Sequence, residues 1–338
     1  MLIIRLSALG DVAMTLPAIY SLAEQYPSLD IHVLTRPFFA KLFINAPANV
    51  EVIGADFKRE YKGIRGMTRL LRRLARLHPD CVADLHNVLR SWTIDTFFRL
   101  RGVKVAMVRK QRASRRKLLR NHTPQTNFVD RYAQVFAKLG YPIHLTFRSI
   151  FPDGAPGSPV EIQHPAIGIA PFARYANKTY PPDRMFRAVR LLASQGYHIY
   201  LFGGRGDEAE TLGKWASEVS CCTSLAGQFP ITDELAIMAH MDAMITMDSA
   251  NQHLAALTGT RVVSIWGSTA PICGFLAYGQ NPADTICMNL PCQPCSVAGM
   301  PECPLGHFDC MNRITPQAIA DKIHGIVPPP LQKQNTPS

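Results

Sequence analysis

The sequence contains no run of eighteen or more apolar residues, the length that a membrane-spanning helix needs. Its first residues predict a strand, with Arg5 and Asp11 close behind, and match neither a secretory signal nor a transmembrane helix. The nine cysteines are odd in number and include the adjacent Cys221 and Cys222, which makes a poor disulfide framework. These absences predict a cytoplasmic protein.

Two signatures of other nucleotide-dependent enzymes are also missing. The first strand-to-helix turn lacks GxGxxG, and no Tyr-xxx-Lys pair is evident, which argues against a Rossmann dehydrogenase or a nucleotide-sugar epimerase. Between Arg101 and Arg120 there is neither an acidic nor an aromatic residue. The missing aromatics argue against stacking of single-stranded nucleic acid, while the unbalanced charge predicts an anionic partner. That partner is a nucleic acid, an acidic membrane surface or a multiply charged substrate.

The chain has 338 residues, 47% of them hydrophobic and 18% charged, with a net charge of +11. This length and composition predict a globular protein of two domains. Part of the positive charge lies on one candidate helix, and we expect these side chains to form a solvated basic face. The helix carries five arginines: Arg65, Arg69, Arg72, Arg73 and Arg76.

Short apolar runs alternate with helical patterns along the chain, which predicts parallel sheets covered on both faces. Phe151–Pro159 is rich in proline and glycine and interrupts this alternation, so the domain boundary is placed there. The predicted domains are residues 1–150 and 160–325, followed by a tail at 326–338. Two α/β units of similar size predict a bilobed protein with its site between the lobes.

The stretch Ser7–Asp11 lies between an apolar run, Leu2–Leu6, and a periodic segment predicted as the helix Val12–Glu24. Strand ends of this kind open onto the ligand crevice of α/β sheets, so Asp11 is a candidate proton acceptor. The alternative is that Asp11 only caps the helix, since aspartate is a preferred N-cap residue.

Three strand ends in the second half suit a nucleotide. Phe202–Asp207 is a glycine-rich turn that opens a helix, and Trp266–Thr269 runs into a hydroxyl-rich turn. Met247–His253 is more specific, because a helix N-terminus, a hydroxyl and a histidine follow a strand there. The alternatives are that Asp248 caps the helix and that His253 is an ordinary helix-face histidine.

Cys292 and Cys295 form a CxxC pair, and Cys303 and Cys310 follow with His307 between them. The cluster is either a structural zinc site or a proline-stiffened loop with reduced thiols, and no catalytic role is expected for it.

Four motifs occur in order: Ser7-Ala-Leu-Gly-Asp-Val with Leu16-Pro-Ala, Lys178-Thr-Tyr-Pro, Asp248-Ser-Ala-x-x-His253, and Trp266-Gly-Ser-Thr-x-Pro271. Together they resemble glycosyltransferase family 9, the bacterial lipopolysaccharide heptosyltransferases, from Met1 to about Ile323. The resemblance implies an α/β protein of GT-B architecture, with two Rossmann-like lobes whose parallel sheets face a central cleft. It also implies inverting transfer from ADP-heptose, or a related nucleotide sugar, without a metal or another cofactor.

The resemblance further implies the roles of individual residues. Asp11 matches the catalytic base, and Lys178 matches the cation near the diphosphate. The sugar-nucleotide motif is matched by Asp248, Ser249, Ala250 and His253, although Ala250 stands where the family usually has glycine. Asp207 falls near the ribose and Phe229 near the adenine. The acidic residue, the cation and the helix are what a single-displacement sugar transfer requires.

Two classes of function therefore remain. The first is a heptosyltransferase that acts on an anionic lipopolysaccharide-precursor acceptor at the inner face of the inner membrane, binds no nucleic acid, and docks its acceptor on the basic segment Arg109–Arg120. The second is a non-catalytic basic α/β protein that binds nucleic acid or anionic lipid.

Overall fold

The computed structural model describes residues 1–109 and 112–330 and leaves the side chains of residues 112 and 113 undescribed. Its contacts divide the chain into two compact units. Unit 1 comprises Met1–Ala113 and Thr126–Pro152, and unit 2 comprises Ser114–Gln125 and Asp153–Ser338. Helix α6 (Arg112–Asn121) thus belongs mostly to unit 2, although the sequence analysis assigned this stretch to the first domain.

Unit 1 contains a five-stranded parallel sheet, called sheet A here, in the order β3-β2-β1-β4-β5. Its strands are short and mostly apolar, as expected of strands buried on both faces. They are β1 (Leu2–Ile4), β2 (Ile31–Thr35), β3 (Val50–Gly54), β4 (Cys81–Asp84) and β5 (Lys104–Met107). The helices of this unit are α1 (Leu9–Ala13), α2 (Leu16–Gln25), α3 (Pro37–Ala40), α4 (Gly63–Ala75), α5 (Leu89–Arg99) and α7 (Phe128–Leu139).

The first predicted helix is in fact two. The chain leaves α1 after Ala13 and enters α2 at Leu16, and the Thr15 hydroxyl donates a hydrogen bond of 2.7 Å to the Val12 carbonyl. Pro17 lies in the first turn of α2, where its missing N–H costs no hydrogen bond. Asp11 is therefore the third residue of α1, and the N-cap position belongs to Ala8. Asp11 still caps the helix from this third position, because its Oδ2 accepts a hydrogen bond from the Ala8 N–H.

Unit 2 contains a six-stranded parallel sheet, called sheet B here, in the order β11-β10-β9-β6-β7-β8. Its strands are β6 (Ala166–Ala170), β7 (His198–Leu201), β8 (Cys222–Ser224), β9 (Ala243–Met247), β10 (Val262–Trp266) and β11 (Thr285–Cys287). Besides α6, its α-helices are α8 (Pro182–Ser194), α9 (Asp207–Glu218), α10 (Ile231–Met238), α11 (Ala250–Leu257), α12 (Asp309–Asn312) and α13 (Pro316–His324). Three 3₁₀ turns complete the unit, at Ala176–Lys178, Pro271–Cys273 and Pro282–Asp284.

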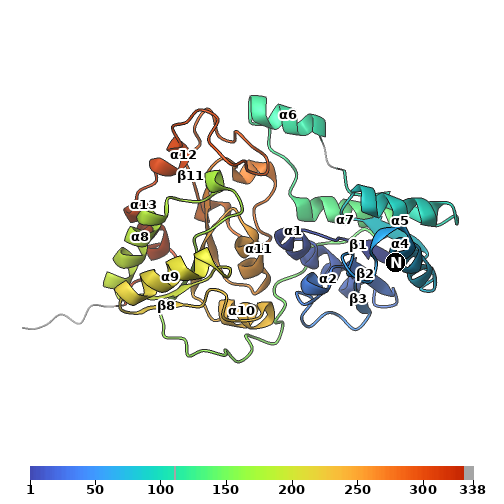
Figure 1. The fold of residues 1–338 in the computed structure, drawn as a ribbon, viewed down its shortest axis with the longest axis horizontal. Helices are drawn as coiled ribbons and strands as arrows, with labels where there is room; N and C mark the ends of the chain where they lie inside the picture. The colour runs from blue at the N-terminus through green and yellow to red at the C-terminus, as the bar shows by residue number, and fades with distance from the viewer. Residues whose placement is uncertain (110–111, 331–338) are drawn as a thin grey trace, which may run out of the picture. The chain divides into compact units, whose positions relative to one another are not determined.

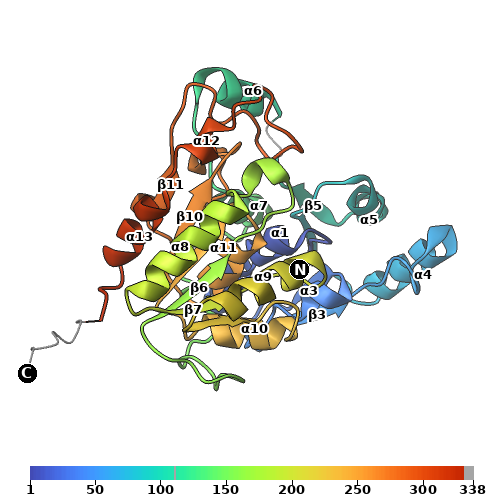
Figure 2. The same ribbon diagram turned by 60° about the vertical axis from the view of Figure 1, so that its left-hand side comes forward.

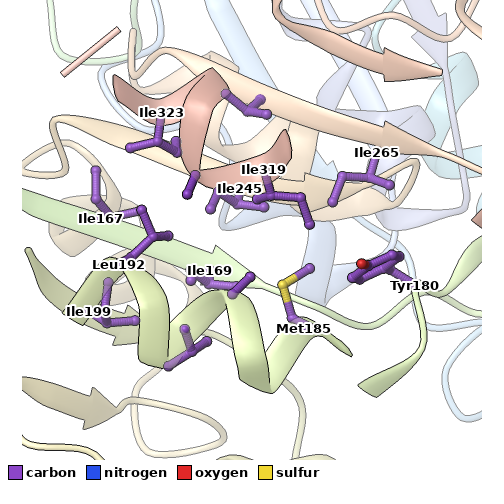
Figure 3. Close-up of a cluster of buried hydrophobic side chains, with 14 of the residues drawn as sticks. Ile167, Ile169, Tyr180, Met185, Leu192, Ile199, Ile245, Ile265, Ile319 and Ile323 are labelled. Carbon is purple, nitrogen blue, oxygen red and sulfur yellow. The ribbon is translucent and has the colours of Figure 1, made fainter. Parts of the chain in front are cut away.

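Helices α8 and α13 cover one face of sheet B. Figure 3 shows Met185 and Leu192 of α8 and Ile319 and Ile323 of α13 gathered against the isoleucines of the strands, and all four side chains are fully buried. Burying each side chain of this size stabilises the fold by about 1.5–3 kcal/mol. This core fixes the strand ends from which the candidate site of unit 2 emerges.

The prediction of two Rossmann-like α/β units, each with a parallel sheet, is confirmed (Figures 1 and 2). Within residues 1–109 and 112–330, no helix is long and apolar enough to cross a membrane.

Candidate functional site

Asp11 lies in the first turn of α1, the helix that follows β1, and not in the loop before a helix. Its side chain is about one-third exposed, and its Oδ2 lies 2.8 Å from Nη2 of Arg5. The same oxygen accepts a hydrogen bond of 3.1 Å from the Ala8 N–H. Both bonds go to Oδ2, so Oδ1 is the atom that is available to take a proton from a ligand.

Arg5 holds Asp11 in place and is itself fixed by the backbone. Its Nη1 donates a 2.6 Å hydrogen bond to the Leu85 carbonyl, and its Nε donates one of 2.9 Å to the Ser7 carbonyl. The residue is buried, with 7% of its surface exposed. A guanidinium held at three points is a rigid support for the Asp11 carboxylate.

A second carboxyl group follows the neighbouring strand β4, and the sequence analysis did not identify it. Asp84 accepts hydrogen bonds of 2.8 Å from the N–H groups of His86 and Asn87, and one of 2.7 Å from the Ser91 hydroxyl. The turn that Asp84 shapes also brings Nε2 of His86 to 3.4 Å from the Ser7 hydroxyl. Asp84 therefore orders the turn beside the loop that leads to Asp11.

Asp95 of α5 lies next to Asp84 and is fully buried. Burial and the nearby Asp84 carboxyl raise the pKa of Asp95 to about 8. Protonation of Asp95 removes the repulsion between two buried carboxylates, so this side chain favours its neutral form at neutral pH. In the sequence, the only indication of this pair was that Asp95 lies between the apolar residues Ile94 and Phe98, which are buried in the structure.

In unit 2, Lys178 and Asp248 form a buried ion pair. Nζ of Lys178 lies 2.7 Å from Oδ2 of Asp248, and the two side chains are 13% and 6% exposed. The Thr269 hydroxyl donates to the same oxygen at 2.6 Å, and the Gln252 amide donates to Oδ1 at 3.0 Å. Three of roughly four acceptor positions on this carboxylate are thus occupied, which leaves about one for a ligand hydroxyl.

The turn after β10 holds Lys178 in position. The Ser268 hydroxyl donates to Oδ1 of Asn177 at 2.9 Å, and the Ser268 N–H donates to the Asn177 carbonyl at 3.0 Å. A Cβ atom on Gly267 would lie 2.5 Å from that carbonyl, so only glycine permits this close approach. The sequence analysis proposed this turn as a phosphate contact, but both of its hydroxyls bond to protein partners.

Ser249, and not Asp248, is the N-cap residue of α11. The interpretation of Asp248 as a cap is therefore wrong. The Ser249 Oγ is buried, has no hydrogen-bond partner among the described residues and makes no capping bond to the helix. Ala250 begins the helix, and His253 is buried within it at 6% exposure. An unsatisfied hydroxyl beside the free N–H groups of a helix start is a suitable place for an anionic oxygen.

Asp207 and Phe229 lie on segments of unit 2 that are distant in sequence from Lys178 and Asp248. Asp207 is the exposed first residue of α9, and Phe229 is half-buried ahead of α10. The glycine turn before α9 is already bonded, because the Gly204 N–H donates to the Glu208 carboxylate at 2.6 Å. A ligand at this turn would have to displace or share Glu208.

The cysteine cluster is not arranged as a metal-binding group in the described part of the chain. Among residues 1–109 and 112–330, no three histidine, cysteine or acidic side chains are grouped closely enough to hold a metal ion. Within the cluster, Sγ of Cys292 lies 4.0 Å from Nε2 of His307. The geometry gives no support to the zinc alternative.

Residues 112–120 of the basic segment lie in helix α6. Leu118 is fully buried, whereas Arg116, Lys117 and Arg120 are exposed. Lys110 lies outside the described residues, as does the side chain of Arg112.

Solved structures with the same arrangement of two parallel sheets define the class of fold. The chain aligns with E. coli heptosyltransferase WaaC with ADP at a TM-score of 0.68 and 18% identity, covering 96% of this chain and 99% of that one. A glycosyltransferase family 9 structure from Veillonella parvula aligns at a TM-score of 0.70 and 17% identity, covering 96% of each chain. The fold is that of the GT-B glycosyltransferases.

Sequence comparison identifies the family. The model of glycosyltransferase family 9 (heptosyltransferase) matches residues 67–305, and the chain belongs to this family. It is similar to lipopolysaccharide heptosyltransferase 1 of Pseudomonas aeruginosa, with 24% identity over 96% of this chain and 97% of the relative. It also matches lipopolysaccharide heptosyltransferase 3 of Escherichia coli, with 25% identity over 77% of this chain and 81% of the relative. The protein is a glycosyltransferase, so the alternative of a non-catalytic basic protein is not supported.

Proposed function

We propose that the protein transfers a heptose, or a closely related sugar, from ADP-heptose to an inner-core acceptor of lipopolysaccharide, with inversion at the anomeric carbon. The names of its relatives support the donor and acceptor classes. The observation that carries the mechanism is the position of Asp11, whose partly exposed carboxylate has one oxygen fixed by Arg5 and the other available.

In the proposed reaction an acceptor hydroxyl attacks the anomeric carbon of the donor. Oδ1 of Asp11 takes the hydroxyl proton while the bond between the anomeric carbon and the diphosphate breaks, and ADP leaves with the electron pair. A base that is positioned in this way contributes about 10²–10⁴-fold to the rate. The attack comes from the face opposite the leaving group, so the configuration inverts.

The groups of unit 2 are proposed to bind the donor and to stabilise the departing diphosphate. Lys178 supplies a positive charge, and Ser249 and the first N–H groups of α11 supply hydrogen-bond donors. Preorganised donors of this kind favour the transition state because charge develops on the phosphate oxygens there. Asp248 holds Lys178 and retains an acceptor position for a sugar hydroxyl, while His253 supports α11 from within.

The remaining assignments concern recognition. Asp207 is proposed to contact the ribose and Phe229 to contact the adenine, and no metal or other cofactor takes part. The exposed cations of α6 are proposed to bind the carboxylates and phosphates of the acceptor. The enzyme is proposed to work in the cytoplasm at the inner membrane, in peripheral contact with its surface, with no nucleic acid as partner.

A donor screen tests the proposal. The purified protein is incubated with a lipopolysaccharide-precursor acceptor and a panel of nucleotide sugars, with and without EDTA, and the products are weighed by mass spectrometry. We expect the acceptor to gain the mass of one heptose from ADP-heptose in both conditions. Transfer from another donor alone would contradict the sugar assignment, and loss of transfer in EDTA would contradict the metal-independent mechanism.

A further inference from the structure

Five exposed arginines lie on α4, and no role in the reaction has been given to them. Four of them follow one another at helical spacing and form a single stripe: Arg65, Arg69, Arg72 and Arg76. With Arg73 they line a hollow of about 640 Å³ to which Glu60 contributes an acidic side chain. Within the described part of the chain, no ion pair joins any of these five arginines to a carboxylate.

The helix that carries these arginines is held against the loop that precedes it. A Cβ atom on Gly66 would lie 2.3 Å from the Tyr61 backbone, so the loop before α4 lies directly against the helix. Nη1 of Arg73 donates a 3.0 Å hydrogen bond to the Tyr61 hydroxyl, which ties the loop to the last turn of the helix. The loop cations Lys58, Arg59 and Lys62 are also exposed and add to the same local charge. Figure 2 shows α4 extending outward from the strands of unit 1.

Large apolar side chains are exposed beside this charge. Ile64, in the first turn of α4, is 87% exposed. Leu89 and Trp92, in the first turn of α5, are 77% and 42% exposed. The two helix starts are linked, because the Arg90 guanidinium lies 4.6 Å from the centre of the Phe57 ring, in the loop before α4. Exposed apolar side chains beside a basic stripe are typical of a surface that lies in a membrane interface.

The topology places these apolar side chains on the side of the sheet that carries the proposed base. Strands β1, β3 and β4 are parallel, so their carboxyl ends lie at the same edge of sheet A. The segments that follow these ends carry Asp11, Ile64 and Leu89, respectively. A bilayer that meets this edge would present a lipid-borne acceptor on the side of Asp11.

We propose that the α4 arginines, together with Ile64, Leu89 and Trp92, form a docking surface for a bilayer of anionic lipids. The arginines contact the headgroup phosphates, and the three apolar side chains enter the interfacial layer. The inference rests on the proposed function only for its reason to approach a membrane, since the acceptor of that reaction is carried by a lipid.

Vesicle flotation tests the charge contribution. The unmodified protein should float with phosphatidylglycerol-rich vesicles and not with pure phosphatidylcholine vesicles. High salt should release it, because the Debye length falls from about 10 Å at 0.1 M to about 3 Å at 1 M. Absence of binding to the anionic vesicles would overturn the proposal.

A matched pair of variants locates the surface. Arg65→Gln, Arg69→Gln, Arg72→Gln and Arg76→Gln in one protein should weaken anionic-vesicle binding by roughly fivefold per cation, which is several hundred-fold in total. The control neutralises four exposed cations elsewhere and loses the same formal charge: Lys138, Arg148, Arg190 and Lys214, each to glutamine. We expect the control to bind within a few-fold of the unmodified protein. Equal losses in the two variants would show a response to net charge alone and would overturn the proposal.

Tryptophan fluorescence tests the apolar contribution. The chain has three tryptophans, and Trp215 and Trp266 are buried whereas Trp92 is exposed. Anionic vesicles should therefore shift the emission to shorter wavelength through Trp92 alone. The Trp92→Phe protein should lose this shift and still float. A shift that persists without Trp92 would show that the membrane does not contact this surface.

These outcomes are separate from those of the proposed function. The vesicles contain no acceptor and the assay contains no donor, so failure of sugar transfer would leave the binding result unchanged. The α4 variant should also bind a soluble, delipidated acceptor fragment as the unmodified protein does. A variant that loses the fragment but keeps the vesicles would identify a saccharide site and would overturn the membrane assignment.

Discussion

Replacing Asp95 with asparagine should remove most of the pH dependence of the stability of unit 1 between about pH 5 and pH 7. Burial and the Asp84 carboxyl raise the pKa of Asp95 to about 8 in the folded protein, whereas an unfolded aspartate titrates near 3.9. Between these values the folded chain holds a proton that the unfolded chain has released. Stability from this group is therefore complete below pH 4 and is lost as the pH rises toward 8.

The free energy of unfolding should fall by about 1.4 kcal/mol per pH unit through this group. The unmodified protein therefore loses about 3 kcal/mol of stability between pH 5 and pH 7. An asparagine side chain keeps the shape of a protonated aspartate. The variant should thus gain stability relative to the unmodified protein by a similar amount over that range.

Hydrogen exchange in urea, followed by mass spectrometry of peptides from β4 and α5, measures the free energy of unfolding of this part of the chain. Asp80→Asn is a suitable control because Asp80 is exposed, and it should leave the slope unchanged. Parallel pH profiles for Asp95→Asn and the unmodified protein would refute the raised pKa of Asp95.

Three further predictions concern other parts of the molecule. In urea unfolding, Gly66→Ala should destabilise unit 1 by about 1–3 kcal/mol, because the new Cβ would lie 2.3 Å from the Tyr61 backbone. Gly213→Ala in α9 places its Cβ in open space and should stabilise unit 2 by about 0.5–1 kcal/mol. Lys178→Met should destabilise unit 2 by about 3–5 kcal/mol, since Asp248 would be left buried without its ion-pair partner, and calorimetry should show weaker ADP binding; unchanged affinity would contradict its contact with the diphosphate. Replacing four cations of α6 with glutamine should raise the acceptor KM and flatten its salt dependence without affecting donor binding: Arg115, Arg116, Lys117 and Arg120. An unchanged KM would leave the helix without this role.

Strand positions could be predicted well because buried parallel strands are short apolar runs. The apolar runs Ile31–Thr35 and Ala166–Ala170, for example, form the strands β2 and β6. The break between α1 and α2 was missed, because the apolar spacing continues through Thr15 and gives no sign of an interruption. Periodicity reports which residues face a core and says little about how one helix ends.

Contacts between distant residues account for most of what the sequence could not show. Lys178 and Asp248 were each assigned near the ligand, but their pairing depends on the packing of the turn after β10 against Asn177. Asp84 and Asp95 come together only because α5 packs back onto the end of β4. An isolated aspartate in an apolar helix was the only sign of that pair in the sequence.

The role of Asp11 is tested most directly by measuring heptose transfer from ADP-heptose by the Asp11→Asn protein. Asparagine can still accept the hydrogen bonds from Arg5 and the Ala8 N–H, so the fold and the loop should remain intact. We predict that turnover falls by about 10²–10⁴-fold while the Kd for ADP stays within a few-fold of that of the unmodified protein. Near-normal turnover in the variant would contradict the assignment of Asp11 as the general base.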